Sequence, residues 1–307
     1  MAMPLAIRED APTYDLTAQQ ASSDDQLIEL WLHGRPAKTQ RAYRADIARL
    51  RATLQKPIAQ MTLADLHIFA DSLADHAPSS QARMLAGVKS LFTFALRIGY
   101  LRLNVAAALK SPKKKNTIGE RLMTEEEIIR ILALEDMEGD GRNYALLRTM
   151  YAAALRVSEA CALCWRDVQA HGDSAVLVVF GKGAKTRTVR IDATTYRRML
   201  GIRPESADPD DPIFLSQRGG QLDPSAVWRV VQAAAIRAGV RVRTADDGSR
   251  TSEVSPHWLR HAHATHAIDR GAPLSLVQAT LGHASLATTG IYAHARPSES
   301  SGRYLPL

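Results

Sequence analysis

Residues 255 to 294 read S-P-H-W-L-R-H-A-H-A-T-H-A-I-D-R-G-A-P-L-S-L-V-Q-A-T-L-G-H-A-S-L-A-T-T-G-I-Y-A-H. Ser255 suits a helix N-cap and Pro256 suits the first helical position, so a helix is predicted from here to about Arg270, where a glycine follows. A second helix is expected to end at Gly282, and a third element follows it. The stretch is therefore predicted to be a run of short helices joined by tight turns.

Four side chains of this stretch have chemistry in common. His257 and Arg260 stand three residues apart, which places them on one face of a helix, and His283 and Tyr292 follow in the later elements. An arginine binds phosphate oxygens at any working pH, a histidine moves protons near neutrality, and a tyrosine becomes a nucleophile once a neighbour accepts its proton. The set suits reaction at a phosphate, and a helical core with solvated histidines is the alternative.

Composition sets the limits of the interpretation. The 307 residues, 46% of them hydrophobic, are enough for two domains. Lys and Arg outnumber Asp and Glu by 39 to 32, and the resulting charge of +7 favours a polyanion such as nucleic acid. Glu9 and Asp10 interrupt any signal segment, and no apolar run reaches a membrane span. We expect a cytoplasmic protein without a membrane partner.

The cysteines and histidines do not form a convincing metal motif. Cys161 and Cys164 are the whole cysteine content, and a zinc site needs about four ligands. The four histidines between 257 and 266 lack an acidic ligand at helical spacing. We expect structural thiols and no metal.

Patterning along the chain predicts a domain order. A flexible tail spans 1–22, an all-α domain spans 23–108, a basic linker spans 109–120, a mixed α+β, mainly helical domain spans 121–296, and a tail spans 297–307. Within the first domain, Tyr43, Ile47, Leu50 and Leu54 form a helical apolar stripe. The other faces of that helix carry Lys38, Arg41 and Arg44, and the linker carries Lys113, Lys114 and Lys115. These cations either contact DNA phosphates or face solvent.

The second domain begins with a capping box formed by Thr124 and Glu127. An apolar helix is predicted over 143–155, running directly into Arg156. Because a charge at the edge of a core requires a partner, we expect Glu159, three residues on, to pair with Arg156.

The clearest strands are 175–180 and 186–191. The connector G-K-G-A-K predicts a hairpin with Lys182 and Lys185 at its tip and Arg187 just beyond. We expect this tip either to enter a DNA groove or to face solvent. A short strand is expected at 213–215, a helix from Asp223 to about Ala238, and a loop at 240–253.

These motifs together, A-L-R-V-S-E, G-K-G-A-K-T-R, H-W-L-R-H-A-H-A-T-H, L-G-H-A-S-L-A-T-T and I-Y-A-H, resemble the tyrosine recombinase (phage integrase) family, most like its compact Xer-type members. K-T-Q-R-A-Y-R-A-D-I resembles the family's core-binding domain. Ala154 stands where a glycine is common, and Trp258 where an acidic residue is common.

The resemblance implies a fold, in which an all-α core-binding (SAM-like) domain and a catalytic domain with a small β-hairpin or sheet clamp duplex DNA. It also implies that Tyr292 attacks a phosphodiester to give a 3′-phosphotyrosyl link, without ATP, metal or cofactor. The implied roles are charge stabilisation by Arg156, Arg260 and His283, protonation of the leaving oxygen by Lys182, and handling of the tyrosine proton by His257. Glu159 would support Arg156, and the remaining histidines, including His294, would be non-catalytic.

The implied function is site-specific recombination of double-stranded DNA through a Holliday junction. Dimer resolution and integration or excision remain alternatives, as do a homo-tetramer and a hetero-tetramer with a second recombinase. The last residues either dock on a neighbouring protomer or fray. A catalytically silent DNA-binding protein of the same fold and a type IB topoisomerase-like enzyme are the competing functions.

Overall fold

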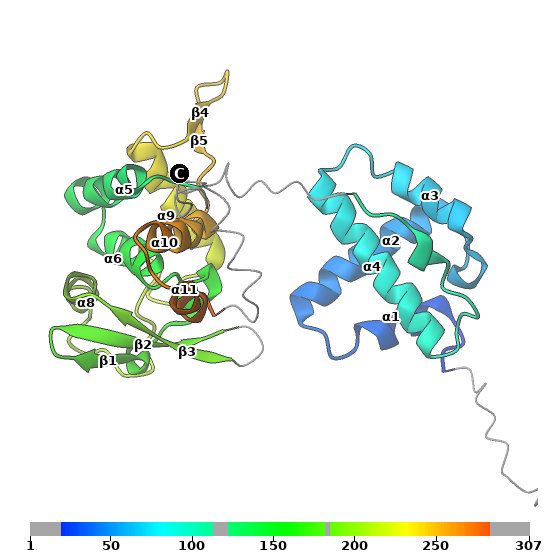
Figure 1. The fold of residues 1–307 in the computed structure, drawn as a ribbon, viewed down its shortest axis with the longest axis horizontal. Coiled ribbons are helices and arrows are strands. Elements are labelled where there is room, and N and C mark those ends of the chain that lie inside the picture. The colour runs from blue at the N-terminus through cyan, green and yellow to red at the C-terminus, as the bar shows by residue number, and fades with distance from the viewer. Residues whose placement is uncertain (1–19, 113–121, 182–184, 283–307) are drawn as a thin grey trace, which may run out of the picture. The chain divides into compact units, whose positions relative to one another are not determined.

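A computed structural model describes residues 20–112, 122–181 and 185–282. The chain divides into two compact units, residues 1–115 and 116–307, and the division falls within the segment predicted as a linker. Figure 1 shows the helices of each unit gathered around their own centre.

The N-terminal unit is all-helical in its described part. Its α-helices are α1 Asp24–Leu32, α2 Ala37–Leu54, α3 Leu63–Asp71 and α4 Pro78–Arg97, with short 3₁₀ turns at Ile58–Gln60 and Val105–Ala108. The apolar stripe of α2 packs inward, since Ile47 and Leu50 are buried in the same core as α4 residues such as Leu91 and Phe92. Leu109, just beyond the expected end of this domain, is also part of this core.

The C-terminal unit is mainly helical with small antiparallel sheets. Its elements are α5 Glu125–Glu138, α6 Gly141–Ala152, α7 Val157–Ala162, β1 Val168–His171, β2 Ser174–Phe180, β3 Thr186–Ile191, α8 Ala193–Leu200, α9 Pro224–Arg237, β4 Val242–Thr244, β5 Arg250–Ser252, α10 Pro256–Asp269 and α11 Leu274–Leu281. The helix α10 contacts α5, α6, α9 and α11, and Figure 1 shows it in orange among them.

The predicted hairpin is present and belongs to a larger sheet. Strands β2 and β3 pair antiparallel from Ala175 opposite Ile191 to Phe180 opposite Thr186. An unpredicted strand, β1, extends the sheet to the order β1-β2-β3. Side chains of β3 alternate, so that Val189 and Ile191 are buried while their neighbours are exposed.

Three expectations for this unit were wrong in detail. The expected strand at 213–215 is not formed, and that range contains one isolated bridge, between Leu215 and Gln221. The expected loop at 240–253 contains the hairpin β4-β5, whose turn is made by polar residues with Gly248 at φ +79°. The helix expected to reach Leu155 ends at Ala152, and Arg156 is the N-cap of a new helix, α7.

Candidate active site

Arg260 is held inside the C-terminal unit by backbone oxygens. Its side chain comes from α10 and is only 3% exposed. Nη1 donates to the carbonyl oxygen of Ala154 at 2.5 Å, and Nη2 donates to the carbonyl oxygen of Leu281. Leu281 is the last residue of α11, and the carbonyls of a last helical turn lack partners within the helix and attract cations. Arg260 therefore connects the turn before Arg156 to the end of α11.

The turn before Arg156 has an unusual backbone. Ala154 lies in the left-handed region at φ +49° and is fully buried. Residues with a Cβ rarely adopt this conformation, and glycine adopts it freely. The sharp bend ends α6, turns the carbonyl of Ala154 to Arg260, and lets Arg156 begin α7.

Arg156 and Glu159 form the pair that their spacing predicts. Arg156 Nη1 donates to Glu159 Oε1 at 2.7 Å, and the Arg156 backbone N–H donates to Oε2 at 2.8 Å. The Glu159 side chain is 2% exposed, whereas that of Arg156 is 30% exposed. Glu159 thus holds both the guanidinium and the backbone of Arg156, whose side chain stays partly exposed.

Arg187 also binds Glu159, which corrects its expected place at the hairpin. Instead of lying on the solvent side as a DNA contact, its side chain is 10% exposed. Nη1 and Nη2 donate to the two oxygens of Glu159 at 2.9 and 2.8 Å, and Nε donates to the carbonyl oxygen of Thr280 at 2.7 Å. The strand period contained the signal, because Arg187 shares the parity of the buried Val189 and Ile191.

The Glu159 carboxylate is the electrostatic centre of this arrangement. Burial alone would raise its pKa, but hydrogen bonds from the Arg187 side chain and from the Arg156 backbone and side chain, with the charge of Arg187, lower the pKa to about 2. The group is therefore a carboxylate at neutral pH and balances one of the two guanidinium charges.

His257 lies near both arginines of the candidate site. It is on α10 and exposed, and its ring stacks with that of His261 at a centroid separation of 6.1 Å. Partial burial, followed by the charges of Arg260 and Arg156, lowers the pKa of His257 below its ordinary value. The neutral imidazole is favoured, and that form can accept a proton.

Gly181 and Gly282 lie against the same arginine, Arg187. A Cβ at Gly181 would lie 3.6 Å from Glu159 Oε1 and 3.9 Å from Arg187 Nη1, and one at Gly282 would lie 3.0 Å from Arg187 Cδ. Their chain neighbours Lys182 and His283, like Tyr292 and His294, lie outside the described residues.

His263 and His266 bond within the fold. His263 Nδ1 is 2.8 Å from the carbonyl oxygen of Tyr151. His266 Nε2 is 2.9 Å from the carbonyl oxygen of Met123, so it must carry the proton, and Nδ1 accepts from the Tyr151 hydroxyl at 2.9 Å. Both histidines line a cavity of about 500 Å³ together with Tyr151. These hydrogen bonds connect α10 to α6 and to Met123, near the first described residues of the C-terminal unit.

The expected DNA-contacting cations differ in their surroundings. Lys38, Arg41 and Lys185 are exposed. Arg44 is bonded to Glu29 of α1, with Nη2 at 2.8 Å from both carboxylate oxygens. Lys113, Lys114 and Lys115 fall outside the described residues.

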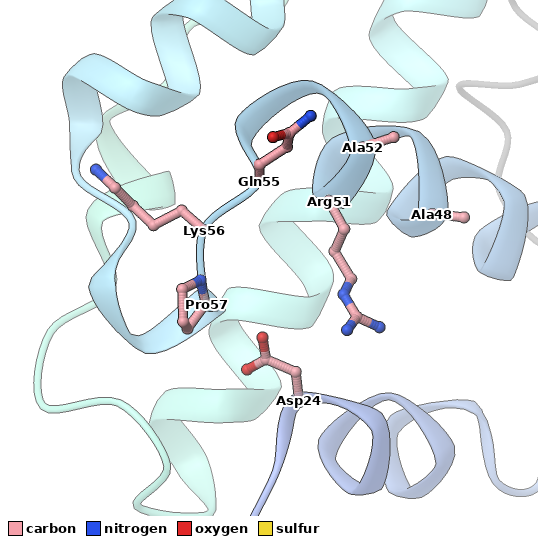
Figure 2. Close-up of a pocket in the computed structure, with 7 residues that line it drawn as sticks. All are labelled: Asp24, Ala48, Arg51, Ala52, Gln55, Lys56 and Pro57. Atoms are coloured by element: carbon pink, nitrogen blue, oxygen red, sulfur yellow. The ribbon is translucent and has the colours of Figure 1, made fainter.

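The N-terminal unit has an open hollow of about 530 Å³ between α1 and α2. Figure 2 shows Asp24 of α1 and Arg51 of α2 facing it. Its polar side chains have partners within the unit, since Asp24 accepts from the Tyr100 hydroxyl at 2.6 Å and Arg51 pairs with Asp25 at 2.5 Å. Burial, together with the hydrogen bond to Asp24, raises the pKa of Tyr100 to about 12. The polar side chains at the hollow are therefore explained by contacts that stabilise the N-terminal unit.

Both cysteines are free thiols, and burial raises the pKa of Cys161 to about 11. Within the described residues no cluster of three or more His, Cys, Asp or Glu side chains could hold a metal ion. No helix in the same ranges is long and apolar enough to cross a bilayer.

Comparisons with known proteins agree with this architecture. Residues 121–299 match the model of the phage integrase family, and residues 27–99 match that of the phage integrase N-terminal SAM-like domain. Tyrosine recombinase XerC of Corynebacterium efficiens is 35% identical over 85% of this chain and 82% of its own length. Tyrosine recombinase XerD of Mycobacterium tuberculosis is 34% identical over 84% of this chain and 88% of its own length.

A solved structure shows the same fold. A lambda integrase tetramer bound to a Holliday junction superposes with a TM-score of 0.70 at 18% identity, covering 90% of this chain and 78% of that one. Fold, site and relatives define a DNA breaking and rejoining enzyme, a site-specific tyrosine recombinase. The chain belongs to the phage integrase family, as its motifs indicated.

Proposed function

We propose that the candidate site binds one DNA phosphodiester and that Tyr292 attacks its phosphorus. The new bond joins the tyrosine oxygen to phosphorus, the bond from phosphorus to the 5′-oxygen breaks, and Lys182 supplies the proton that the leaving oxygen takes up. A 3′-phosphotyrosyl link and a 5′-hydroxyl result. Attack by the 5′-hydroxyl of another strand reverses these steps and exchanges the strands through a Holliday junction.

The observation that supports this proposal is the shared anchoring of Arg156 and Arg260. Both arginines are fixed by the bend at Ala154: the Ala154 carbonyl binds Arg260, and Arg156 starts the helix two residues later. Preorganised cations stabilise the charge that develops on phosphate oxygens without reorganising during the reaction. His283, two residues after the end of α11, is proposed to donate a further hydrogen bond to these oxygens.

His257 is proposed to accept or orient the proton of Tyr292. Its lowered pKa supports this role, because the unprotonated ring is the competent form. Proton transfer of this kind contributes about 10²- to 10⁴-fold to a rate.

The proposed substrate is duplex DNA with specific recombination sites. Exposed Lys38, Arg41 and Lys185, together with Lys113, Lys114 and Lys115 of the linker, are proposed phosphate contacts. By analogy with the lambda integrase tetramer, four protomers are proposed to assemble on two sites. The relatives include both a XerC and a XerD, so the tetramer consists of this chain alone or of this chain with a second recombinase. We expect the reaction to take place in the cytoplasm.

A covalent trapping assay tests the proposal. The enzyme is incubated with half-sites that carry a nick next to the scissile phosphate, and the products are separated on a denaturing gel. A protein–DNA adduct is expected with the unchanged enzyme and not with Tyr292→Phe. Specific binding without an adduct would support a catalytically silent DNA-binding protein, and relaxation of plasmids without a specific site would support a topoisomerase-like enzyme.

The same assay tests Lys182. Lys182→Ala is expected to lose cleavage of a normal 5′-oxygen and to keep cleavage of a 5′-thiolate leaving group, which departs without a proton. Equal loss on both substrates would contradict its role as general acid.

A further inference from the structure

Arg187 connects three parts of the catalytic unit. It lies on β3, and each of its three guanidinium nitrogens donates a hydrogen bond to the protein: two bonds reach Glu159 of α7, and the third reaches the Thr280 carbonyl of α11. With a side chain only 10% exposed, it is among the more buried cations of the described ion pairs. Arg187 thus joins the sheet, the helix after Arg156 and the last turn of α11.

Each of these partners in turn supports a residue of the proposed reaction. Glu159 accepts two hydrogen bonds from Arg156, one from Nη1 and one from the backbone N–H. Thr280 lies in the last turn of α11, where the Leu281 carbonyl already holds Arg260. One guanidinium therefore links the residues that hold both proposed catalytic arginines, and His283 follows two residues after the end of α11.

We propose that Arg187 is a positioning residue, which holds the guanidinium of Arg156 and the end of α11 in register with each other. The inference rests on the proposed function, because it assigns Arg187 a task in that reaction. It replaces the expectation that Arg187 contacts DNA. A phosphate would have to compete with the Glu159 carboxylate, which already balances the charge of Arg187 at 2.8 and 2.9 Å.

The geometry of the guanidinium matters as much as its charge. A planar fork can bind both oxygens of one carboxylate and leave Nε free to bind a third acceptor, whereas a lysine ammonium is a single point donor. Arg187→Lys keeps the charge and loses this geometry. If positioning is the role, lysine cannot replace arginine in the chemical step.

The test compares Arg187→Lys with Arg190→Lys. Arg190 is a matched control, since it lies on the same strand but on the opposite, exposed face. With DNA saturated by enzyme, Arg187→Lys is expected to slow single-turnover cleavage of the nicked half-site by about 10²-fold, the effect of a displacement of about 1 Å at a reacting centre. Arg190→Lys is expected to cleave at the unchanged rate. Thermal melting of each variant identifies a temperature at which all of them are folded.

Two further readouts separate positioning from other roles. The slope of log Kobs for DNA against log salt is expected to stay unchanged in Arg187→Gln, whereas loss of a phosphate contact would reduce it by about 0.9. The cleavage defect of Arg187→Lys is expected to persist with a 5′-thiolate leaving group, because the phosphate-binding groups are displaced. Recovery of the rate on that substrate would show that Arg187 acts through Lys182, and would overturn the proposal.

Glu159→Asp provides a second route to the same answer. It keeps the charge but shortens the side chain by one methylene, so it is expected to impair cleavage as Arg187→Lys does. Cleavage by Arg187→Lys at the unchanged rate would overturn this inference alone. Absence of an adduct with the unchanged enzyme would overturn the proposed function, and this inference with it.

Discussion

Ala154 combines a strained backbone with a buried side chain. Its φ of +49° costs roughly 1 kcal/mol for a residue with a Cβ, and its methyl group packs with Ala264, Val277 and Leu281. For Ala154→Gly the relief of strain is offset by the lost methyl contacts and by the flexibility of glycine. We expect the free energy of unfolding in urea to change by less than about 1 kcal/mol.

Ala154→Val is the informative partner of this substitution. A β-branched side chain is poorly tolerated in the left-handed region and also overfills a fully buried position, so a loss of about 3 kcal/mol or more is expected. Val and Gly variants of equal stability would show that the bend is not under strain.

The depressed pKa of Glu159 predicts a pH dependence of stability. Its folded value of about 2 lies below the ordinary value of 4.5, so its contribution is complete above about pH 4.5 and is lost as the pH falls through about 2. The shift corresponds to an order of 3 kcal/mol. Urea unfolding of Glu159→Gln should therefore give a lower free energy than the unchanged protein at pH 7, and the gap should narrow toward pH 2.

Glu29→Gln is the control for this titration. Glu29 also pairs with an arginine, but its side chain is 65% exposed, and exposed ion pairs contribute little. A gap that stays constant between pH 7 and pH 2 for Glu159→Gln would contradict the role of the bound arginines in lowering its pKa.

At the residue scale, local spacing predicted some contacts and not others. The pair of Arg156 and Glu159 follows from a separation of three residues, and the structure confirms it. The hydrogen bonds that position Arg260 could not be predicted. Their acceptors are the backbone carbonyls of Ala154 and Leu281, and any residue type supplies a carbonyl. Distant acceptors of this kind leave no trace in a sequence pattern.

The end of α11 depends on Gly282 at the scale of the element. Gly282 has φ +64°, and a Cβ there would lie 3.0 Å from Arg187 Cδ. Gly271 has φ +83° and open space around it, so Gly271→Ala experiences only the backbone strain, about 1 kcal/mol. Gly282→Ala should lose more stability than Gly271→Ala in thermal melts and should also slow adduct formation. Similar melting temperatures for the two variants would mean that the Arg187 side chain can move away from the added methyl group without loss of stability.

Paired and unpaired cations of α2, as the described residues define them, are expected to affect the salt dependence of DNA binding differently. Among described residues, no ion pair involves Lys38 or Arg41, whereas Glu29 already neutralises Arg44. Lys38→Ala and Arg41→Ala are each expected to reduce the slope of log Kobs for DNA against log salt by about 0.9, and Arg44→Ala by less. Binding titrations from 50 to 200 mM salt measure the slopes. A larger effect at Arg44 would contradict the assignment of Lys38 and Arg41 as the phosphate contacts.

Elements with strong local signals could be predicted, and those without them could not. Thr62 with Asp65 and Thr124 with Glu127 form capping boxes, and the helices that follow begin there. The hairpin β4-β5 escaped prediction because its strands are short, polar and exposed, so alternation of apolar residues could not mark them. Its turn residues around Gly248 were the available signal.

On the scale of the whole molecule, the two units have separate hydrophobic cores. Each described core is built within its own unit, so residues 1–115 expressed alone should unfold cooperatively by circular dichroism. A chain ending at residue 108 should be less stable by about 2 kcal/mol, because Leu109, 2% exposed, belongs to this core. Equal melting of both chains would place Leu109 outside the folding unit.

The hydrogen bond between His266 and the Met123 carbonyl has a mechanical consequence. Met123 is the second described residue after the linker, and His266 lies on the same helix as Arg260. A force that pulls residue 123 away from the body of the unit must either break this bond or drag α10 with it. Tension on the chain at residue 123 is thus passed to the helix that carries Arg260.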